Sequence, residues 1–235
     1  MKRAIITGAS KGIGRAISYL LAKNGFLVGA LARSKEILSN MREDDNRIMP
    51  IICDVTDEKG MKAAVDDFMK AHDTIEALIN CAGYARHKPF TQYSVEDWKT
   101  HIDVNLNGMF LAIRYVLPYM LKQGYGDIVN ISSMSGKLGH PGGSAYCASK
   151  HAVHGFSKSI LAEVREKGIR VTTIYPGSTD TGMLKENIKN LDARAAIKVE
   201  DIAVAVLHVL NSPKHVIYEE INLTPAKSVI VNTIR

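Results

Sequence analysis

The sequence predicts an α/β fold, in which a doubly wound, mostly parallel sheet of about seven strands carries helices on both faces. Short apolar runs rich in Ile and Val alternate with longer amphipathic stretches almost from end to end of the 235 residues, which is the pattern of repeated strand–helix units. The composition is 46% hydrophobic and 23% charged, as in an ordinary globular protein. The length suits one domain, expected to span residues 1–235.

Each expected strand is an apolar run bounded by turn residues. The strands are placed at 3–7, 26–31, 48–53, 77–80, 127–132, 170–175 and 215–223. Apolar residues recur at spacings of three and four between these strands. That spacing predicts helices at 12–24, 57–72, 97–123, 145–168 and 199–211. Ligands of open α/β sheets bind at the carboxyl ends of strands, so we expect the chemistry near the loops 139–143 and 176–182.

Charge and cysteine content exclude several classes of function. The net charge of +6 comes from scattered Lys and Arg residues, which favours a solvated surface over a nucleic-acid interface. No stretch approaches the roughly 18 apolar residues of a spanning helix, and the first apolar run is too short for a signal peptide. We therefore expect a cytoplasmic protein without a membrane or nucleic-acid partner. The three cysteines lack a CxxC pair, so free thiols and no metal site are expected.

A glycine-rich turn follows the first expected strand, where residues 7–14 read TGASKGIG with the spacing GxxxGxG. Glycines permit positive φ and place no Cβ between backbone amides and a pyrophosphate, while the following helix presents its amide-rich, positive end. Such a turn can be a tight turn and nothing more, but its position after the first strand favours a dinucleotide site. The expected cofactor contacts here are Gly8, Ser10, Lys11, Gly12, Ile13 and Gly14.

The end of the second strand distinguishes NAD from NADP. An acidic side chain there would bind the ribose 2′-OH and repel a 2′-phosphate. This strand ends in Ala32 and Arg33 without an acid, and the planar guanidinium of Arg33 suits a phosphate, with Lys11 as a second cation. The alternative is that both are solvated basic residues. We expect NADP(H) to be preferred over NAD(H).

The end of the third strand offers a second nucleotide contact. Asp54, followed by Val55, would lie near the adenine amino group. An Asp at this position could equally cap the next helix, although Asp57 is nearer the expected helix start. Asp54 and Val55 are therefore included among the expected cofactor contacts.

Tyr146 and Lys150 are four residues apart in an expected helix, so their side chains share one face. A Lys ammonium one turn from a phenol stabilises the phenolate, and so does an oxidised nicotinamide ring, which predicts that the pKa of Tyr146 falls from about 10 towards the working pH. Tyr146 could then act as a general acid or base. On its own the pair could also be an ordinary amphipathic surface pair.

Taken together, these motifs resemble the short-chain dehydrogenase/reductase family over nearly the whole chain. The family's pieces appear in order: TGASKGIG at 7–14, Asp54, NCAG at 80–83, Asn105 in VNLNG, Ser133, the YxxxK at 146–150, and Pro176-Gly177 followed by Thr179 and Thr181. The resemblance implies a Rossmann fold with the catalytic site in the same domain. It also implies a homodimer or homotetramer formed through the helices at 97–123 and 145–168.

The resemblance assigns roles to individual residues. Ser133 would hydrogen-bond the substrate carbonyl, Tyr146 would transfer the proton, Lys150 would bind the nicotinamide ribose, and Asn105 would position a water of the proton relay. The cofactor contacts it adds are Asn80, Ala82, Gly83, Tyr146, Lys150, Pro176, Gly177, Thr179 and Thr181. Ser132 could compete with Ser133, but only Ser133 has the family's separation of thirteen residues from Tyr146.

Three further features bear on the site. Cys81 replaces the second Asn of the family's NNAG, and Cys147 beside Tyr146 is expected to be a buried structural thiol. The segment 182–199 is short and polar, so the pocket is expected to be open. His87, His140 and His151 surround the motifs and could supply an acid or a substrate contact.

The leading prediction is an NADP(H)-dependent oxidoreductase that acts on a small carbonyl or alcohol, such as a ketone, aldehyde, sugar or 3-oxoacyl substrate. The alternative is a cofactor-binding regulatory or scaffold protein without turnover. The presence of Asn105, Ser133, Tyr146 and Lys150 together favours the enzyme, because a non-enzyme has no chemical need of that set. A nucleic-acid-binding protein would require a clustered basic face that the sequence does not show.

Overall fold

Seven parallel strands form one sheet in the computed structural model, which describes residues 1–187 and 192–229. The strand order is β3-β2-β1-β4-β5-β6-β7, so the chain reverses its direction of winding between β1 and β4. This is the doubly wound Rossmann arrangement expected from the sequence, and it places a crevice at the carboxyl ends of β1 and β4. The strands are β1 (Lys2–Thr7), β2 (Phe26–Ala32), β3 (Ile48–Ile52), β4 (Ala77–Asn80), β5 (Gly126–Ile131), β6 (Ile169–Pro176) and β7 (Glu220–Leu223).

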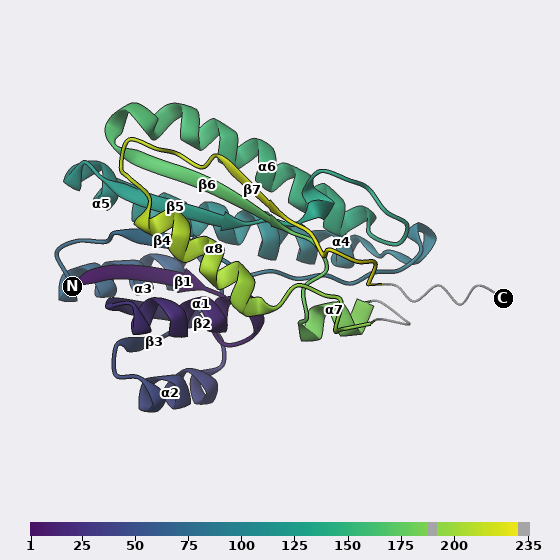
Figure 1. Cartoon of the computed structure of the whole chain (residues 1–235), viewed down its shortest axis with the longest axis horizontal. Helices are drawn as coiled ribbons and strands as arrows, with labels where there is room; N and C mark the ends of the chain where they lie inside the picture. The colour runs from purple at the N-terminus through teal and green to yellow at the C-terminus, as the bar shows by residue number, and fades with distance from the viewer. Residues whose placement is uncertain (188–191, 230–235) are drawn as a thin grey trace.

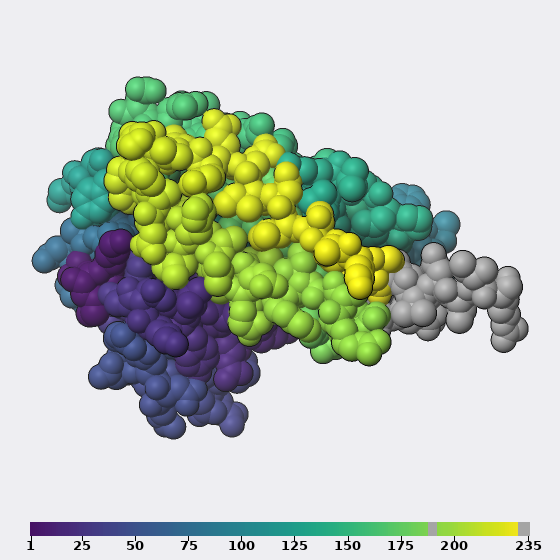
Figure 2. Space-filling model, viewed as in Figure 1, coloured from purple at the N-terminus to yellow at the C-terminus, as the bar shows by residue number. Residues whose placement is uncertain are grey.

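Helices cover both faces of the sheet because successive residues of each strand point to opposite sides. In β1, Ala4 and Ile6 join the core on one face, beneath α1 (Gly12–Lys23), α2 (Lys35–Asp44) and α8 (Val199–Asn211). Ile5 points the other way, towards α3 (Glu58–Ala71), α5 (Gly108–Gln123) and α6 (Ser144–Val164). Figure 1 shows α8 in front of the strands, and Figure 2 shows the segment after α8, in yellow, lying along the surface beside α6.

The predicted helix at 97–123 is interrupted by a π-helical turn. The helix begins earlier, as α4 (Val95–Ile102), passes through the wide turn η2 (Asp103–Asn107) and continues as α5. Ser94 and Asp97 form a capping box that explains the early start. A π turn accommodates one extra residue within a helix and is frequent at functional sites; this one contains Asn105.

Other boundaries also differ from the sequence-based prediction. Helix α2 was not predicted, since it is short, polar and buries only Leu38 and Met41. Strand β7 begins at Glu220 rather than 215, because Arg170 engages the preceding segment. The helix predicted to end at 168 gives way at Arg165 to the short turn η4 (Arg165–Lys167), and α7 (Gly182–Asn187) lies in the polar segment 182–199, where no helix was predicted.

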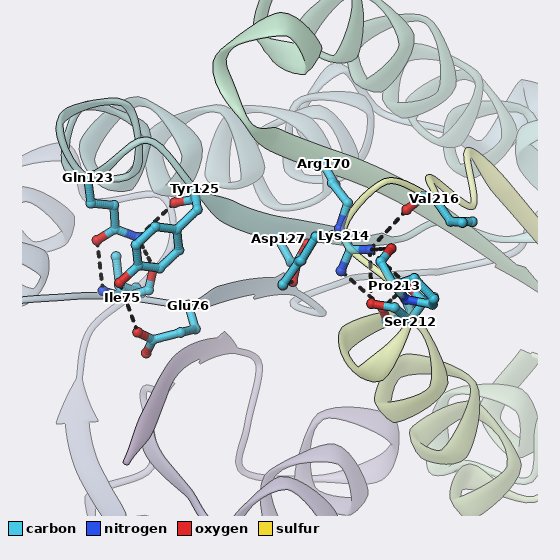
Figure 3. A network of polar contacts seen from close by, with 11 residues as sticks. Ile75, Glu76, Gln123, Tyr125, Asp127, Arg170, Ser212, Pro213, Lys214 and Val216 are labelled. Atoms are coloured by element: carbon cyan, nitrogen blue, oxygen red, sulfur yellow. Dashed lines mark hydrogen bonds and ion pairs between the residues drawn. The ribbon is translucent and has the colours of Figure 1, made fainter.

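Arg170 ties the amino ends of β5 and β6 to the end of α8. Its side chain is 6% exposed and pairs with the equally buried Asp127. Its remaining nitrogens donate to the Ser212 hydroxyl and to four backbone carbonyl groups at the end of α8 and just beyond it. Figure 3 shows Arg170 reaching from the strand towards Ser212, Pro213 and Val216. The guanidinium thereby satisfies helix-terminal carbonyl groups that have no partner within the helix.

Within residues 1–187 and 192–229, no helix is both long and apolar enough to cross a membrane. All three cysteines are free thiols, and Cys147 is buried, as predicted.

Candidate active site

The glycine-rich turn packs so closely on its neighbours that side chains would not fit. Gly8 has φ +67, and a Cβ on it would lie 2.7 Å from the Cα of Ala82. A Cβ on Gly14 would collide with the carbonyl group of Gly8. Gly12, with φ +53, opens α1. The turn therefore leaves its backbone amides and the first turn of α1 uncovered, which is the cradle that a pyrophosphate requires.

Thr7 joins this turn to the loop after β4. Its hydroxyl oxygen accepts hydrogen bonds from the backbone N–H groups of Cys81 at 3.0 Å and Ala82 at 3.1 Å. Asn80 lies within the sheet, where its Nδ2 donates to Asn130 Oδ1 at 2.9 Å and its own Oδ1 has no partner. The crevice between β1 and β4 is thus fixed by side-chain bonds on both of its strands.

Arg33 and Asp54 face one another across the carboxyl ends of β2 and β3. Arg33 Nη1 lies 3.6 Å from Asp54 Oδ2, and the Arg33 side chain is 80% exposed. Asp54 Oδ1 also accepts from the backbone and hydroxyl of Thr56. Burial raises the pKa of Asp54, but the Thr56 bonds and the Arg33 charge outweigh it, so the pKa is lowered overall. Arg33 therefore has a carboxylate partner but remains accessible to an anion.

Asp54 stabilises the turn that precedes α3, so the capping alternative describes part of its role. Asp57 occupies the N-cap position of α3 without a side-chain cap bond. Val55 is buried and packs against Gly108 at the start of α5. Lys11 is exposed at the N-cap of α1, on the side of the glycine-rich turn.

Asn105 holds the loop after β4 through its side-chain amide. Its Oδ1 accepts from the backbone N–H of Tyr84 at 2.7 Å, and its Nδ2 donates to the Tyr84 carbonyl and to Ser149 Oγ, both at 2.9 Å. The side chain is buried and its polar atoms are all engaged. That Asn105 positions a water of the proton relay, as the resemblance implies, stays a prediction.

Lys150 is buried on α6 and directed at the carboxyl end of β5. Its Nζ donates to the carbonyl oxygen of Ile131 at 3.0 Å and lies 5.9 Å from the centre of the Tyr146 ring. Burial lowers the pKa of Lys150 to about 8. Gly83 lies beside it, since a Cβ there would be 4.0 Å from Lys150 Nζ.

Tyr146 and Ser133 meet in one cavity, as their order in the sequence predicted. Burial raises the pKa of Tyr146, and a hydrogen bond with Ser133 opposes that effect. Lys150 does not oppose this rise, because its ammonium group bonds to the carbonyl oxygen of Ile131; the fall of the pKa expected from Lys150 together with an oxidised nicotinamide stays a prediction. Ser132, the competing candidate, directs its hydroxyl at the carbonyl oxygen of Lys150.

The cavity has a volume of about 580 Å³, and residues at the start of α1 and in the segment after β6 also line it. That segment is tightly bonded: Thr179 donates to Gly177, Thr181 donates to Thr179, and the N–H of Leu184 donates to Thr181. The predicted residues that line the cavity are Ile13, Ser133, Tyr146, Pro176, Gly177, Thr179 and Thr181.

Residues of α7, within the segment 182–199, line one side of the cavity; that the pocket is open stays a prediction. Met183, Leu184 and Asn187 of α7 line it, and Asn187 bonds to the loop after β4. Residues 188–191 lie outside the described part of the chain. Sequence reasoning missed α7 because one and a half turns of helix are too few for a periodic signal.

Two of the three histidines line the cavity. His87 lies 4.9 Å from His140 and 5.9 Å from Tyr146, measured between ring centres. His151 is exposed on α6 and its Nδ1 pairs with the carbonyl of Cys147, so it belongs to the surface. Ser135, which pairs with His140, was not predicted.

Comparison with known proteins agrees with this arrangement. The sequence model described as short chain dehydrogenase matches residues 2–192. An uncharacterized oxidoreductase of Staphylococcus epidermidis is 34% identical over 229 residues, which cover 95% of this chain and 97% of the relative. Another, from Staphylococcus aureus strain N315, is 37% identical over 232 residues with the same coverage.

Solved structures show the same likeness in three dimensions. ElxO with NADP bound superposes with a TM-score of 0.89 at 25% identity, covering 95% of this chain and 97% of that one. A 3-oxoacyl-[acyl-carrier protein] reductase from Brucella melitensis superposes with a TM-score of 0.87 at 28% identity, covering 95% and 90%.

Proposed function

Because the chain belongs to the short-chain dehydrogenase family, we propose that it is an oxidoreductase that transfers a hydride between NADP(H) and the carbonyl or alcohol carbon of a small molecule. The observation that carries the proposal is the meeting of Tyr146 and Ser133 in a cavity that also borders the glycine-rich turn. Relatives named as oxidoreductases and a structural neighbour with NADP bound support it.

The residues present fit a dinucleotide. The uncovered amides around Gly8 and Gly12 suit a pyrophosphate, and Arg33 at the end of β2 suits a 2′-phosphate. The segment from Pro176 to Thr181 borders the cavity on the side where the nicotinamide would lie. When bound, NADPH supplies the hydride that a carbonyl reduction consumes. We assign one cofactor-binding domain to residues 1–235.

The protein's own part in the reaction is to bind and protonate oxygen. Ser133 donates its hydroxyl to the substrate oxygen, and Tyr146 supplies the proton that this oxygen gains when the carbonyl becomes an alcohol. The pKa of Lys150 is lowered to about 8, so its ammonium group can lose and regain a proton near neutral pH. Leaving the Ile131 carbonyl for the ribose would bring its ammonium to bear on the phenol.

The proposal is tested by following NADPH absorbance with a panel of ketones, aldehydes, sugars and 3-oxoacyl thioesters. At least one carbonyl should be reduced, and Tyr146→Phe should lower kcat by on the order of 100- to 10,000-fold, since only the transferable proton is lost. NADPH binding, measured by fluorescence, should stay within about twofold. A wild-type protein that binds NADPH but reduces none of the panel would favour the regulatory or scaffold alternative.

A further inference from the structure

The cavity that Tyr146 lines contains hydrogen-bonding side chains that are already engaged within the protein. His140 Nδ1 lies 3.2 Å from the carbonyl oxygen of Pro141, which can only accept, so Nδ1 carries the proton. His140 Nε2 is then an acceptor, and the Ser135 hydroxyl donates a hydrogen bond to it at 3.1 Å. Neither nitrogen of His140 remains available to a ligand.

Asn187 is engaged in the same way. Its Oδ1 accepts from the backbone N–H of His87 at 2.7 Å. Its Nδ2 donates to the carbonyl oxygens of Met183 at 2.8 Å and Ala85 at 3.2 Å. Both atoms of this amide therefore hold α7 against the loop after β4 and cannot orient a substrate.

His87 is different, because its ring lines the cavity with hydrogen-bonding capacity to spare. Nε2 is shielded from solvent and has no partner. A buried polar group without a hydrogen-bond partner destabilises the folded state, so a ligand that supplied a partner would recover that free energy. Rotation about the Cβ–Cγ bond exchanges the two edges of the ring, and this torsion is soft. The ring nitrogen can thus turn towards the cavity without movement of the backbone.

The backbone that carries His87 is held by hydrogen bonds at four of the five positions from 84 to 88. The bonds come from elements far apart in the sequence, namely the π turn, α4, α7 and the loop before α6. The four pairs are Tyr84 with Asn105, Arg86 with His101, His87 with Asn187, and Lys88 with the carbonyl of Gly142. A ring on so fixed a backbone is suited to recognition, which requires a constant position.

The charge of the cavity limits what the ring can recognise. No Asp, Glu, Lys or Arg side chain lines the cavity among the described residues. Burial, and then the neighbouring His140 and His101, lower the pKa of His87, so its ring is neutral at neutral pH. A carboxylate would therefore lose its hydration without gaining a cation.

We propose that His87 selects the substrate by hydrogen-bonding an uncharged oxygen on the carbon next to the reacting carbonyl, which makes hydroxyketones the preferred substrate class. The inference rests on the proposed function, in which Tyr146 and Ser133 bind the reacting oxygen. With ring centres 5.9 Å apart, Tyr146 and His87 can each hold one of two oxygens on adjacent carbons. The two hydroxyls of the reduced product are held in the same way.

The test compares 1-hydroxybutan-2-one with pentan-3-one, in which a methyl group replaces the hydroxyl, and with 2-oxobutanoate, which adds a charge. With NADPH, the wild type should favour the hydroxyketone over pentan-3-one by about tenfold or more in kcat/KM, since a site built around a polar group discriminates against ligands that lack it. His87→Phe should bring that ratio close to one, mainly through KM. His87→Asn should restore part of it.

His151→Phe is the matched control, because it removes a histidine from the exposed face of α6 and should leave the ratio unchanged. Equal ratios in wild type and His87→Phe would overturn the assignment, and so would a preference for 2-oxobutanoate. If the wild type reduces no carbonyl, the proposed function fails and binding decides the role of His87. Ligand-observed NMR should then show a preference for butane-1,2-diol over pentan-3-ol that His87→Phe abolishes; no preference in the wild type would refute it.

Discussion

Arg33 illustrates how a single side chain can set the choice between two cofactors. It is 80% exposed and shares its charge with Asp54 at 3.6 Å, so a 2′-phosphate would displace a weak ion pair rather than a strong one. An accessible guanidinium at the end of β2 is therefore expected to favour the phosphorylated cofactor at little cost to the free protein.

Arg33→Ala should weaken NADPH binding by roughly tenfold or more, because a charge-assisted hydrogen bond contributes about 1.5–3 kcal/mol. NADH binding should change little. Adding Ala32→Asp should invert the preference by placing a carboxylate against the phosphate. Dissociation constants for both cofactors measure the effect, with the exposed neighbour Lys35→Ala as the control for loss of charge. Unchanged NADPH affinity in Arg33→Ala would show that Arg33 does not bind the 2′-phosphate.

Burial of the charged Lys150 side chain lowers the stability of the folded protein. Its pKa falls to about 8 through burial, so the folded state binds its proton less tightly than the unfolded state does. The cost is present in full below the folded value and disappears as pH rises through the unfolded value near 10.4. Stability at neutral pH is therefore lowered by on the order of 3 kcal/mol at this residue.

Lys150→Met should accordingly raise the free energy of unfolding at about pH 7 while abolishing turnover. Loss of the bond to Ile131 offsets about 1 kcal/mol, which leaves a net gain of about 1–2 kcal/mol. The gain should shrink towards about pH 10. Thermal unfolding at both pH values measures it, and Lys158→Met, which removes an exposed lysine of the same helix, should show no such gain. A variant less stable than wild type at neutral pH would contradict this prediction.

For single residues, the sequence patterns predicted which side chains lie at the cavity better than they predicted the pKa values of those side chains. Tyr146 and Lys150 could be singled out because a spacing of four residues places them on one face of a helix, and Ser133 because the resemblance fixes its separation from Tyr146. The direction of the Tyr146 pKa could not, because it depends on burial and on Lys150 bonding to Ile131. The sequence offered three histidines as possible substrate contacts, and only the hydrogen-bond partners of His140 and the exposure of His151 distinguish His87 from the other two.

Among the elements, α8 depends on a residue outside itself. Arg170 on β6 supplies the donors for its terminal carbonyl groups while pairing with the buried Asp127 (Figure 3). Lys214 also pairs with Asp127 at 3.0 Å, but its side chain is 68% exposed. The two cations thus share a partner and differ in burial.

Arg170→Met should cost about 3–5 kcal/mol, because it leaves Asp127 buried without its main partner and the end of α8 without donors. Lys214→Met should cost less than about 1 kcal/mol, as expected for an exposed pair. Urea unfolding of both variants measures the difference. Equal costs would mean that burial does not determine the strength of these pairs.

Elements with a strong apolar period were predicted within a few residues, and the rest were not. Helix α3, with four buried residues on one face, was expected at 57–72 and spans Glu58–Ala71. Helix α2 buries two residues and gave no such signal. The π turn was hidden for another reason: its residues continue the helical pattern, and only the backbone bonding reveals the wider turn.

For the molecule as a whole, the outer faces of α5 and α6 form a surface suited to a second copy of the chain. Phe110 on α5 is 43% exposed, and its ring centre lies 6.3 Å from that of Phe156 on α6. We expect a homodimer or homotetramer through these helices, as the resemblance implied.

Phe110→Lys should shift the protein towards the monomer by placing a charge in an apolar contact. Sedimentation velocity at several concentrations measures the change. Ile37→Lys, which alters an apolar residue of similar exposure on α2, should leave the assembly intact. A wild type that sediments as a monomer at every concentration would rule out this interface.

The strand order has a consequence for folding of the chain during its synthesis on the ribosome. β1 lies inside the sheet, between β2 and β4, yet its partner β4 pairs Ala77 with Ala4 across more than seventy residues of intervening chain. While the ribosome is still adding that stretch, the apolar edge of β1 is open to solvent and to other nascent chains. Chains halted before β4 should therefore be the ones that aggregate or recruit chaperones, and those halted after β5 should not expose that edge.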